Sequence, residues 1–159
     1  MPSRRELLAA SLPSLHLAGM LAGLGLLPGQ ALAADAPGWN ASAFDAKSVA
    51  DVMKALGVAA PTPSTGVVLS APEIAENGAV VPVGVSSSLP GVTRLMVLVE
   101  KNPATLSALF EMSEAVEPMI TTRVKMGQTS NVYAVAVTKD GALHYAVKEV
   151  KVTLGGCGG

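Results

Sequence analysis

The sequence contains very few cysteine, histidine and aromatic residues. It contains one cysteine and two histidines among 159 residues. A single thiol excludes an internal disulfide and a zinc site built on cysteines, and two histidines leave little for a His-centred catalytic site. Aromatic residues make up only 3% of the chain, so the core has to be built from Val, Leu, Ala and Met. We therefore predict no catalytic constellation, no metal site and no cofactor.

Charged residues are also scarce. They make up 14% of the chain, against about a quarter in an average protein, and the formal net charge is −1. A protein that binds nucleic acid needs a basic excess to neutralise phosphates. The low charge therefore excludes a protein that binds nucleic acid by electrostatic attraction.

The first 33 residues have the features of an export signal. Arg4 and Arg5 stand near the start, and the stretch from there to Asp35 is uncharged apart from Glu6. It closes on Ala31-Leu32-Ala33, which places small residues where a signal peptidase needs them. The arginine pair followed by two leucines resembles a twin-arginine signal, with Leu7 where Phe is usual. The stretch is also long enough for a membrane anchor, but the Ala-x-Ala site favours cleavage. We predict that residues 1–33 are removed and that the mature protein is periplasmic, with no membrane attachment.

Residues 34–66 are predicted to be a lead-in followed by one helix. Apolar residues recur at i, i+3, i+4 and i+7 from Val49 to Leu56, which is the spacing of an amphipathic helix. Asp45 is the expected N-cap, and Gly57 is the expected stop.

After a Pro- and Gly-containing linker over 61–66, the hydrophobic period changes to two. Runs rich in β-branched residues alternate with turn signals, and they predict an all-β domain over residues 67–154. The number of runs favours an antiparallel, immunoglobulin-like β-sandwich without the immunoglobulin disulfide. The expected strands are 67–69, 79–87, 93–101, 120–126, 131–139 and 142–154, with a further short strand over 109–112.

Three local features refine this sandwich. Asp140-Gly141 predicts a hairpin with a type I′ turn, in which both central residues have positive φ. Pro82 predicts an edge strand or a bulge, because proline cannot donate to a strand ladder. The apolar runs 92–99 and 131–137 are expected to leave a sheet face or edge exposed in a lone domain, which would call for a partner.

Several other residues have a simple structural explanation. We interpret His144 as an ordinary strand histidine, and Glu111, Glu114 and Glu117 as a solvated face or turn. The scattered methionines are interpreted as core gap-fillers and not as a copper-binding array. These methionines are Met53, Met96, Met112, Met119 and Met126.

The only thiol lies close to the C-terminus, between two glycine pairs. The segment reads Gly155-Gly156-Cys157-Gly158-Gly159. Glycines offer no side chain to pack and have a large backbone entropy, so we expect a flexible arm over 155–159. Free cysteines are usually buried, yet this one stands where burial is least expected. A lone exposed thiol in an oxidising compartment indicates that the thiol is used.

The surroundings of Cys157 favour a tether over a nucleophile. A catalytic thiol needs a base and a cationic field to lower its pKa, and the nearest charged groups along the chain are Lys151 and the terminal carboxylate. Two alternatives stay open. In one, Cys157 turns over substrate as part of a thiol enzyme or redox protein; in the other, the domain is an adhesion module with an incidental cysteine.

The C-terminal segment resembles the ending of the SoxY family, the sulfur carrier subunits of the periplasmic thiosulfate-oxidising system. It runs Val150-Lys151-Val152-Thr153-Leu154 and then Gly-Gly-Cys157-Gly-Gly. The likeness continues upstream over residues 74–83, 100–103, 122–126 and 128–131.

This resemblance implies a fold, a role and a set of partners. It implies an immunoglobulin-like sandwich that pairs with SoxZ, a second β-sandwich. It makes Cys157 the covalent attachment point of a non-catalytic carrier. The cytochrome SoxAX would join thiosulfate to the thiol oxidatively, and the manganese hydrolase SoxB would release sulfate. The sulfane dehydrogenase SoxCD, where present, would oxidise the remaining sulfur.

We predict that the mature protein begins at or near Ala34. N-terminal sequencing of the exported protein checks this, and a membrane-bound product that starts at Met1 or Pro2 would contradict it. Replacing Arg4 and Arg5 by lysine should leave the precursor inside the cell, because the twin-arginine route depends on that pair. Normal export of the double-lysine variant would exclude this route.

Overall fold

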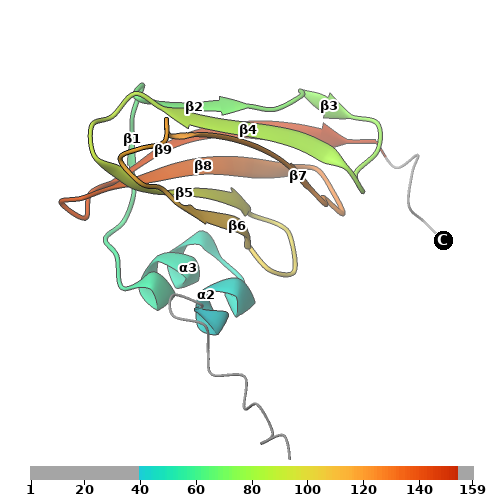
Figure 1. The fold of residues 1–159 in the computed structure, drawn as a ribbon. Helices are drawn as coiled ribbons and strands as arrows, with labels where there is room; N and C mark the ends of the chain where they lie inside the picture. The colour runs from blue at the N-terminus through green and yellow to red at the C-terminus, as the bar shows by residue number, and fades with distance from the viewer. Residues whose placement is uncertain (1–39, 154–159) are drawn as a thin grey trace, which may run out of the picture. The chain divides into compact units, whose positions relative to one another are not determined.

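The computed structural model describes residues 40–153 (Figure 1). Two of the predicted features lie outside these residues. They are the export signal with Arg4 and Arg5, and the C-terminal segment with Gly155, Gly156, Cys157, Gly158 and Gly159. No helix within 40–153 has the length and hydropathy needed to cross a membrane.

Two short helices open the described part of the chain, where the sequence predicted one. They are α2 (Ala41–Asp45) and α3 (Val49–Leu56). The helix predicted over 49–56 is confirmed, and its C-terminal stop is Gly57, which adopts the left-handed conformation with a φ of 66°. The short helix α2 escaped prediction because five residues are too few to show a helical period.

The N-cap predicted at Asp45 is wrong, because Asp45 is the last residue of α2. The cap of α3 is Ser48, whose hydroxyl accepts from the backbone N–H of Asp51 at 3.1 Å and donates to its carboxylate at 2.7 Å. Ser48 lies directly before the first helical residue, so its side chain reaches a free N–H of the first turn.

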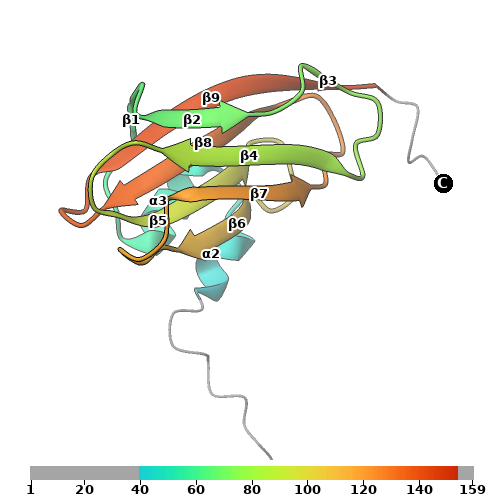
Figure 2. The same cartoon turned by 45° about the horizontal axis from the view of Figure 1, so that its top comes forward.

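Within residues 40–153, nine strands form two sheets that pack face to face (Figures 1 and 2). In the larger sheet the order is β1-β9-β8-β5-β6, with β3 also paired to β9. The smaller sheet has the order β2-β4-β7. The strands are β1 (Thr62–Pro63), β2 (Val67–Ser70), β3 (Ile74–Ala75), β4 (Val81–Ser87), β5 (Val92–Val99), β6 (Leu106–Glu111), β7 (Met119–Val124), β8 (Ser130–Thr138) and β9 (Leu143–Val152).

The predicted all-β, immunoglobulin-like sandwich is confirmed. Two strands depart from its antiparallel pattern, since β1 and β3 both pair with β9 in parallel. Each has only two residues, which is too short to show an alternating pattern, and β1 lies in the segment predicted as a linker. Both strands pair with β9 on the side opposite β8.

The central strands of the larger sheet are buried on both faces. In β5, Leu95 and Val97 enter the core between the two sheets, whereas Met96 and Leu98 enter a second core beneath α2 and α3. Burial of one such side chain stabilises the fold by about 1.5–3 kcal/mol. The expectation that 92–99 and 131–137 leave an exposed apolar face is therefore wrong, because the chain's own helices cover that face.

The hairpin predicted at Asp140-Gly141 joins β8 to β9, but its turn type differs. Of the two residues in this turn, only Gly141 has a positive φ, of 80°. Every residue with a positive φ within 40–153 is a glycine. The N–H of Gly141 donates to the carbonyl of Thr138 at 2.9 Å, and the N–H of Thr138 donates to the carbonyl of Ala142 at 3.0 Å. This is a three-residue loop in which a left-handed glycine follows an ordinary turn, so Asp140 keeps a negative φ.

Pro82 lies in β4, the middle strand of the smaller sheet, and not in an edge strand or a bulge. It pairs with Arg123 of β7, while β2 pairs with β4 only from Gly84 onward. Proline is tolerated at this position because β4 has a strand neighbour on only one side there.

We predict that Gly78→Ala destabilises the protein. A Cβ at this buried residue would lie 2.3 Å from the carbonyl oxygen of Met126 and 2.8 Å from a methyl carbon of Val152. Since the backbone of Met126 has to move, the free energy of unfolding should fall by about 1–3 kcal/mol. Gly127→Ala is the control, because a Cβ there meets nothing within 4 Å. Urea unfolding measures both, and equal stabilities would contradict the prediction.

Candidate functional site

The last described residues of the chain form the root of the cysteine-bearing segment. Pairing between β8 and β9 ends at Ser130 and Val150. Lys151, Val152 and Thr153 continue past that point, and Cys157 follows four residues after Thr153. The structure thus locates where this segment leaves the sandwich, while Cys157 itself lies outside the described residues.

Hydrogen bonds hold this root from two sides. On one side, the N–H groups of Lys151 and Thr153 donate to the carbonyls of Glu73 at 2.9 Å and of Ala75 at 3.1 Å. On the other side, which faces β8, the hydroxyl of Thr129 accepts a hydrogen bond from the N–H of Val152 at 3.0 Å.

Among the described residues, the two ionisable groups with shifted pKa values, Asp140 and Tyr133, lie away from this root. The hydroxyl of Thr138 donates to the carboxylate of Asp140 and lowers its pKa, but this hairpin is at the opposite end of β9. Burial raises the pKa of Tyr133, with a further contribution from the negative charge of Glu100.

The acidic residues considered in the sequence, Glu111, Glu114 and Glu117, are exposed, and two of them pair with cations. Glu111 accepts from Arg94 at 2.9 Å, and Glu114 pairs with Lys139. Within residues 40–153, the structure brings together no group of three or more His, Cys, Asp or Glu side chains that could hold a metal ion. His144 is half-buried in β9, with Ala136 as its neighbour on β8.

The methionines are mostly packing residues, as predicted. Met53, Met96 and Met126 are buried, and Met112 packs against the core between the sheets. Met119 is the exception: it is 59% exposed. The interpretation of Met119 as a core residue is wrong, because it lies on the face of β7 that points away from the larger sheet.

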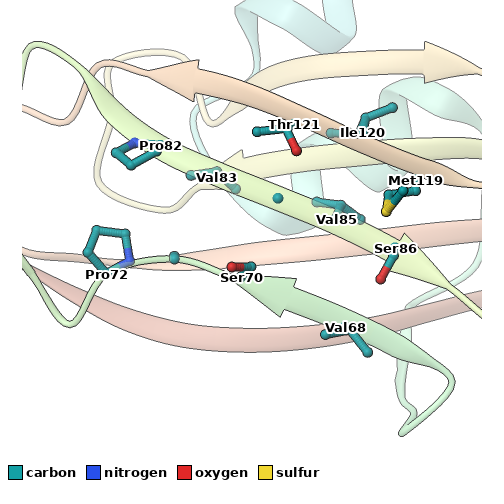
Figure 3. Close-up of a pocket in the computed structure, with 12 residues that line it drawn as sticks. Val68, Ser70, Pro72, Pro82, Val83, Val85, Ser86, Met119, Ile120 and Thr121 are labelled. Carbon is teal, nitrogen blue, oxygen red and sulfur yellow. The ribbon is translucent and has the colours of Figure 1, made fainter.

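A groove runs along the outer face of the smaller sheet (Figure 3). Val81, Val83 and Val85 of β4 point into the core, so the residues that alternate with them point outward. The groove has a volume of about 450 Å³, and its polar side chains are hydroxyls only. Its lining residues are Val68, Ser70, Ala71, Pro72, Pro82, Val83, Gly84, Val85, Ser86, Met119, Ile120 and Thr121.

This outer face is unusually apolar for one that faces water. Val68 is 56% exposed, and the lining includes no charged residue. An antiparallel sheet normally covers its solvent face with polar side chains. The face is therefore better suited to contact with another protein than to catalysis.

Comparison with known families and solved structures identifies the family of this chain. The family model described as "Sulfur oxidation protein SoxY" matches residues 52–157, about two thirds of the chain. The chain belongs to the SoxY family. None of the curated proteins compared with it gives a match.

Two solved structures illustrate its relatives. The sulfur carrier protein SoxY from Chlorobium limicola f thiosulfatophilum is 37% identical, with a TM-score of 0.58, over 65% of this chain and 93% of that one. A superoxide reductase (neelaredoxin) from Ignicoccus hospitalis is 20% identical, with a TM-score of 0.50, over 55% of this chain and 80% of that one. The second likeness concerns the fold alone. Membership of SoxY and the first likeness support a sulfur carrier role within a sulfur-oxidation system.

The sequence analysis did not predict two features described above, namely the outer face of the smaller sheet and the contact of Thr129 with Val152. The outward-facing residues of β2, β4 and β7 carry a single charge, at Arg123, and they indicate an apolar outer face only once these strands are known to be neighbours. The contact of Thr129 with Val152 joins residues 23 positions apart. No local sequence pattern predicts a contact between residues so far apart in the chain.

Proposed function

We propose that this protein is a periplasmic, covalent carrier of thiosulfate-derived sulfur, and that Cys157 is the attachment point. The observation that carries the proposal is the extent of the family match, which runs through the sandwich and ends at Cys157. Gly155, Gly156, Gly158 and Gly159 would form a swinging arm, because glycine permits many backbone conformations and adds no bulk.

The chemistry requires a thiol and an external oxidant. Thiosulfate joins the sulfur of Cys157 with loss of one proton and two electrons, which pass to the haem cytochrome SoxAX. Hydrolysis by SoxB then releases the terminal sulfonate as sulfate and leaves a persulfide on the arm. SoxCD, where present, oxidises this persulfide. A sulfur–sulfur bond suits this sequence because it is covalent and can still be broken by exchange.

The carrier proposal differs from its alternative in where catalysis resides. A thiol enzyme would turn over thiosulfate by itself with an electron acceptor, whereas a carrier does so only with its partner enzymes. The export signal over 1–33 supports a periplasmic location, where these partners would meet the arm.

Partnership with SoxZ is also part of the proposal. The exposed apolar face of β2, β4 and β7 supports it, since contiguous exposed apolar surface marks interaction sites. The larger sheet has α2 and α3 over much of its outer face, so the smaller sheet offers the more open surface.

We predict that Cys157→Ser abolishes thiosulfate loading, because a hydroxyl cannot form the sulfur–sulfur link. Gly156→Val and Gly158→Val should load but release much less sulfate, since a β-branched residue restricts the backbone and adds bulk beside the sulfur. Intact mass after incubation with SoxAX and thiosulfate measures loading, and sulfate release with SoxB measures use. Thermal melting of all three variants should equal that of the wild-type protein. Loading of the serine variant would exclude Cys157 as the attachment point.

We predict that co-expression with SoxZ gives a heterodimer that Met119→Glu weakens. A carboxylate at this position would have to be desolvated in the interface without a partner. Val147→Glu is the matched control, because Val147 is 46% exposed on β9, outside the groove. Size-exclusion chromatography at several concentrations measures dissociation. If only the Val147 variant dissociates, the outer face of the larger sheet is the one that binds SoxZ.

A further inference from the structure

The C-terminal end of β9 projects beyond the sheet that supports it. Its partner β8 begins at Ser130, which pairs with Val150. Lys151, Val152 and Thr153 therefore have no partner residue on β8. A terminal overhang of this kind normally frays, because chain ends keep few contacts unless something ties them down.

Here the overhang is tied down from both sides. On one edge, the two-residue strand β3 pairs Ile74 with Lys151 and Ala75 with Val152. From another part of the chain, Thr129 supplies its hydroxyl as the acceptor for the N–H of Val152, at 3.0 Å. Thr129 lies just before the first residue of β8, so its side chain contacts the overhang where the ladder of β8 has stopped.

Packing adds to these bonds beneath the overhang. The side chain of Val152 is half-buried against the core between the sheets. The turn that follows β3 brings Gly78 so close that an added Cβ would lie 2.8 Å from a methyl carbon of Val152. The N–H of Met126 donates to the carbonyl of Gly78 at 2.7 Å, which fixes this turn to the body of the sandwich.

We propose that Thr129 and β3 form a clamp that sets the pivot of the cysteine-bearing segment at Thr153. This inference rests on the proposed carrier function, and it makes Thr129 a positioning residue that never touches the cargo. The clamp determines how many residues are free to move between the sandwich and the thiol.

The position of the pivot decides the reach of the thiol. From Thr153, Cys157 is four residues away, which allows a span of up to about 14 Å. If the overhang frays back to Val150, the span grows to seven residues, or about 25 Å. The local concentration of a tethered group falls roughly as the −3/2 power of tether length, so fraying lowers it about two-fold.

The test compares Thr129→Val with Thr129→Ser in the heterodimer with SoxZ. Valine keeps the shape and removes the acceptor, whereas serine keeps the acceptor. We expect amide exchange at Val152 to accelerate about ten-fold in the valine variant, as loss of one hydrogen bond implies, and to stay near the wild-type rate in the serine variant. With SoxB, the apparent KM for the loaded carrier should rise about two-fold in the valine variant, at unchanged kcat, and serine should restore it.

Two further variants separate the pivot from general stability. Thr62→Val, at an exposed threonine of β1 whose hydroxyl donates to the carbonyl of Leu143 at the other end of β9, is the control for exchanging threonine for valine in this domain. Insertion of three glycines between Leu154 and Gly155 lengthens the tether without touching Thr129. It should reproduce the two-fold rise in KM at unchanged exchange of Val152, and it remains informative if Thr129→Val fails to fold.

Each outcome decides one question. Unchanged exchange at Val152 in Thr129→Val, or accelerated exchange with an unchanged KM, would overturn the clamp alone. A normal KM in the glycine-insertion variant would also overturn it, since reach would then be irrelevant. A wild-type protein that takes up no thiosulfate would instead overturn the carrier function, and the clamp inference with it.

Discussion

The burial of β5 and β8 on both faces is the constraint on which the rest of the fold depends. Each strand contains a continuous apolar run, 95–99 in β5 and 132–137 in β8, so it needs a cover on each side. The smaller sheet supplies one cover and the helices α2 and α3 supply the other. Because this three-layer core is made of small branched side chains, the stability has to come from close packing across the layers.

This arrangement leaves two features of the protein free for other uses. The smaller sheet covers β5 and β8 with its inner face, which leaves its outer face with Val68, Met119 and the groove uncovered within the described residues. The strand β9 flanks β8 and reaches past its end, where β3 and Thr129 hold its last residues. The sandwich thus holds the chain by hydrogen bonds up to Thr153, four residues before Cys157.

The division between support and chemistry agrees with a carrier role. The described residues with shifted pKa values, Asp140 and Tyr133, lie away from the root of the C-terminal segment. A carrier needs its thiol to be available to other proteins' active sites. It also needs a body whose folding is indifferent to the cargo.

Much of this could be predicted from the sequence, because the relevant signals are local. Alternating β-branched runs, the stop at Gly57 and the hairpin at Asp140-Gly141 all depend on neighbours within a few residues. The role of the glycine-flanked Cys157 stays a prediction. The cap at Ser48 and the turn type of the hairpin are local as well, although the sequence analysis predicted a different cap and a different turn. The exposure of Met119, in contrast, was decided by tertiary structure. So was the placing of Pro82, where β2 falls short of its neighbour. The cover over β5 and β8 and the contact of Thr129 with Val152 join segments far apart in the chain, and only the packing of the folded domain brings them together.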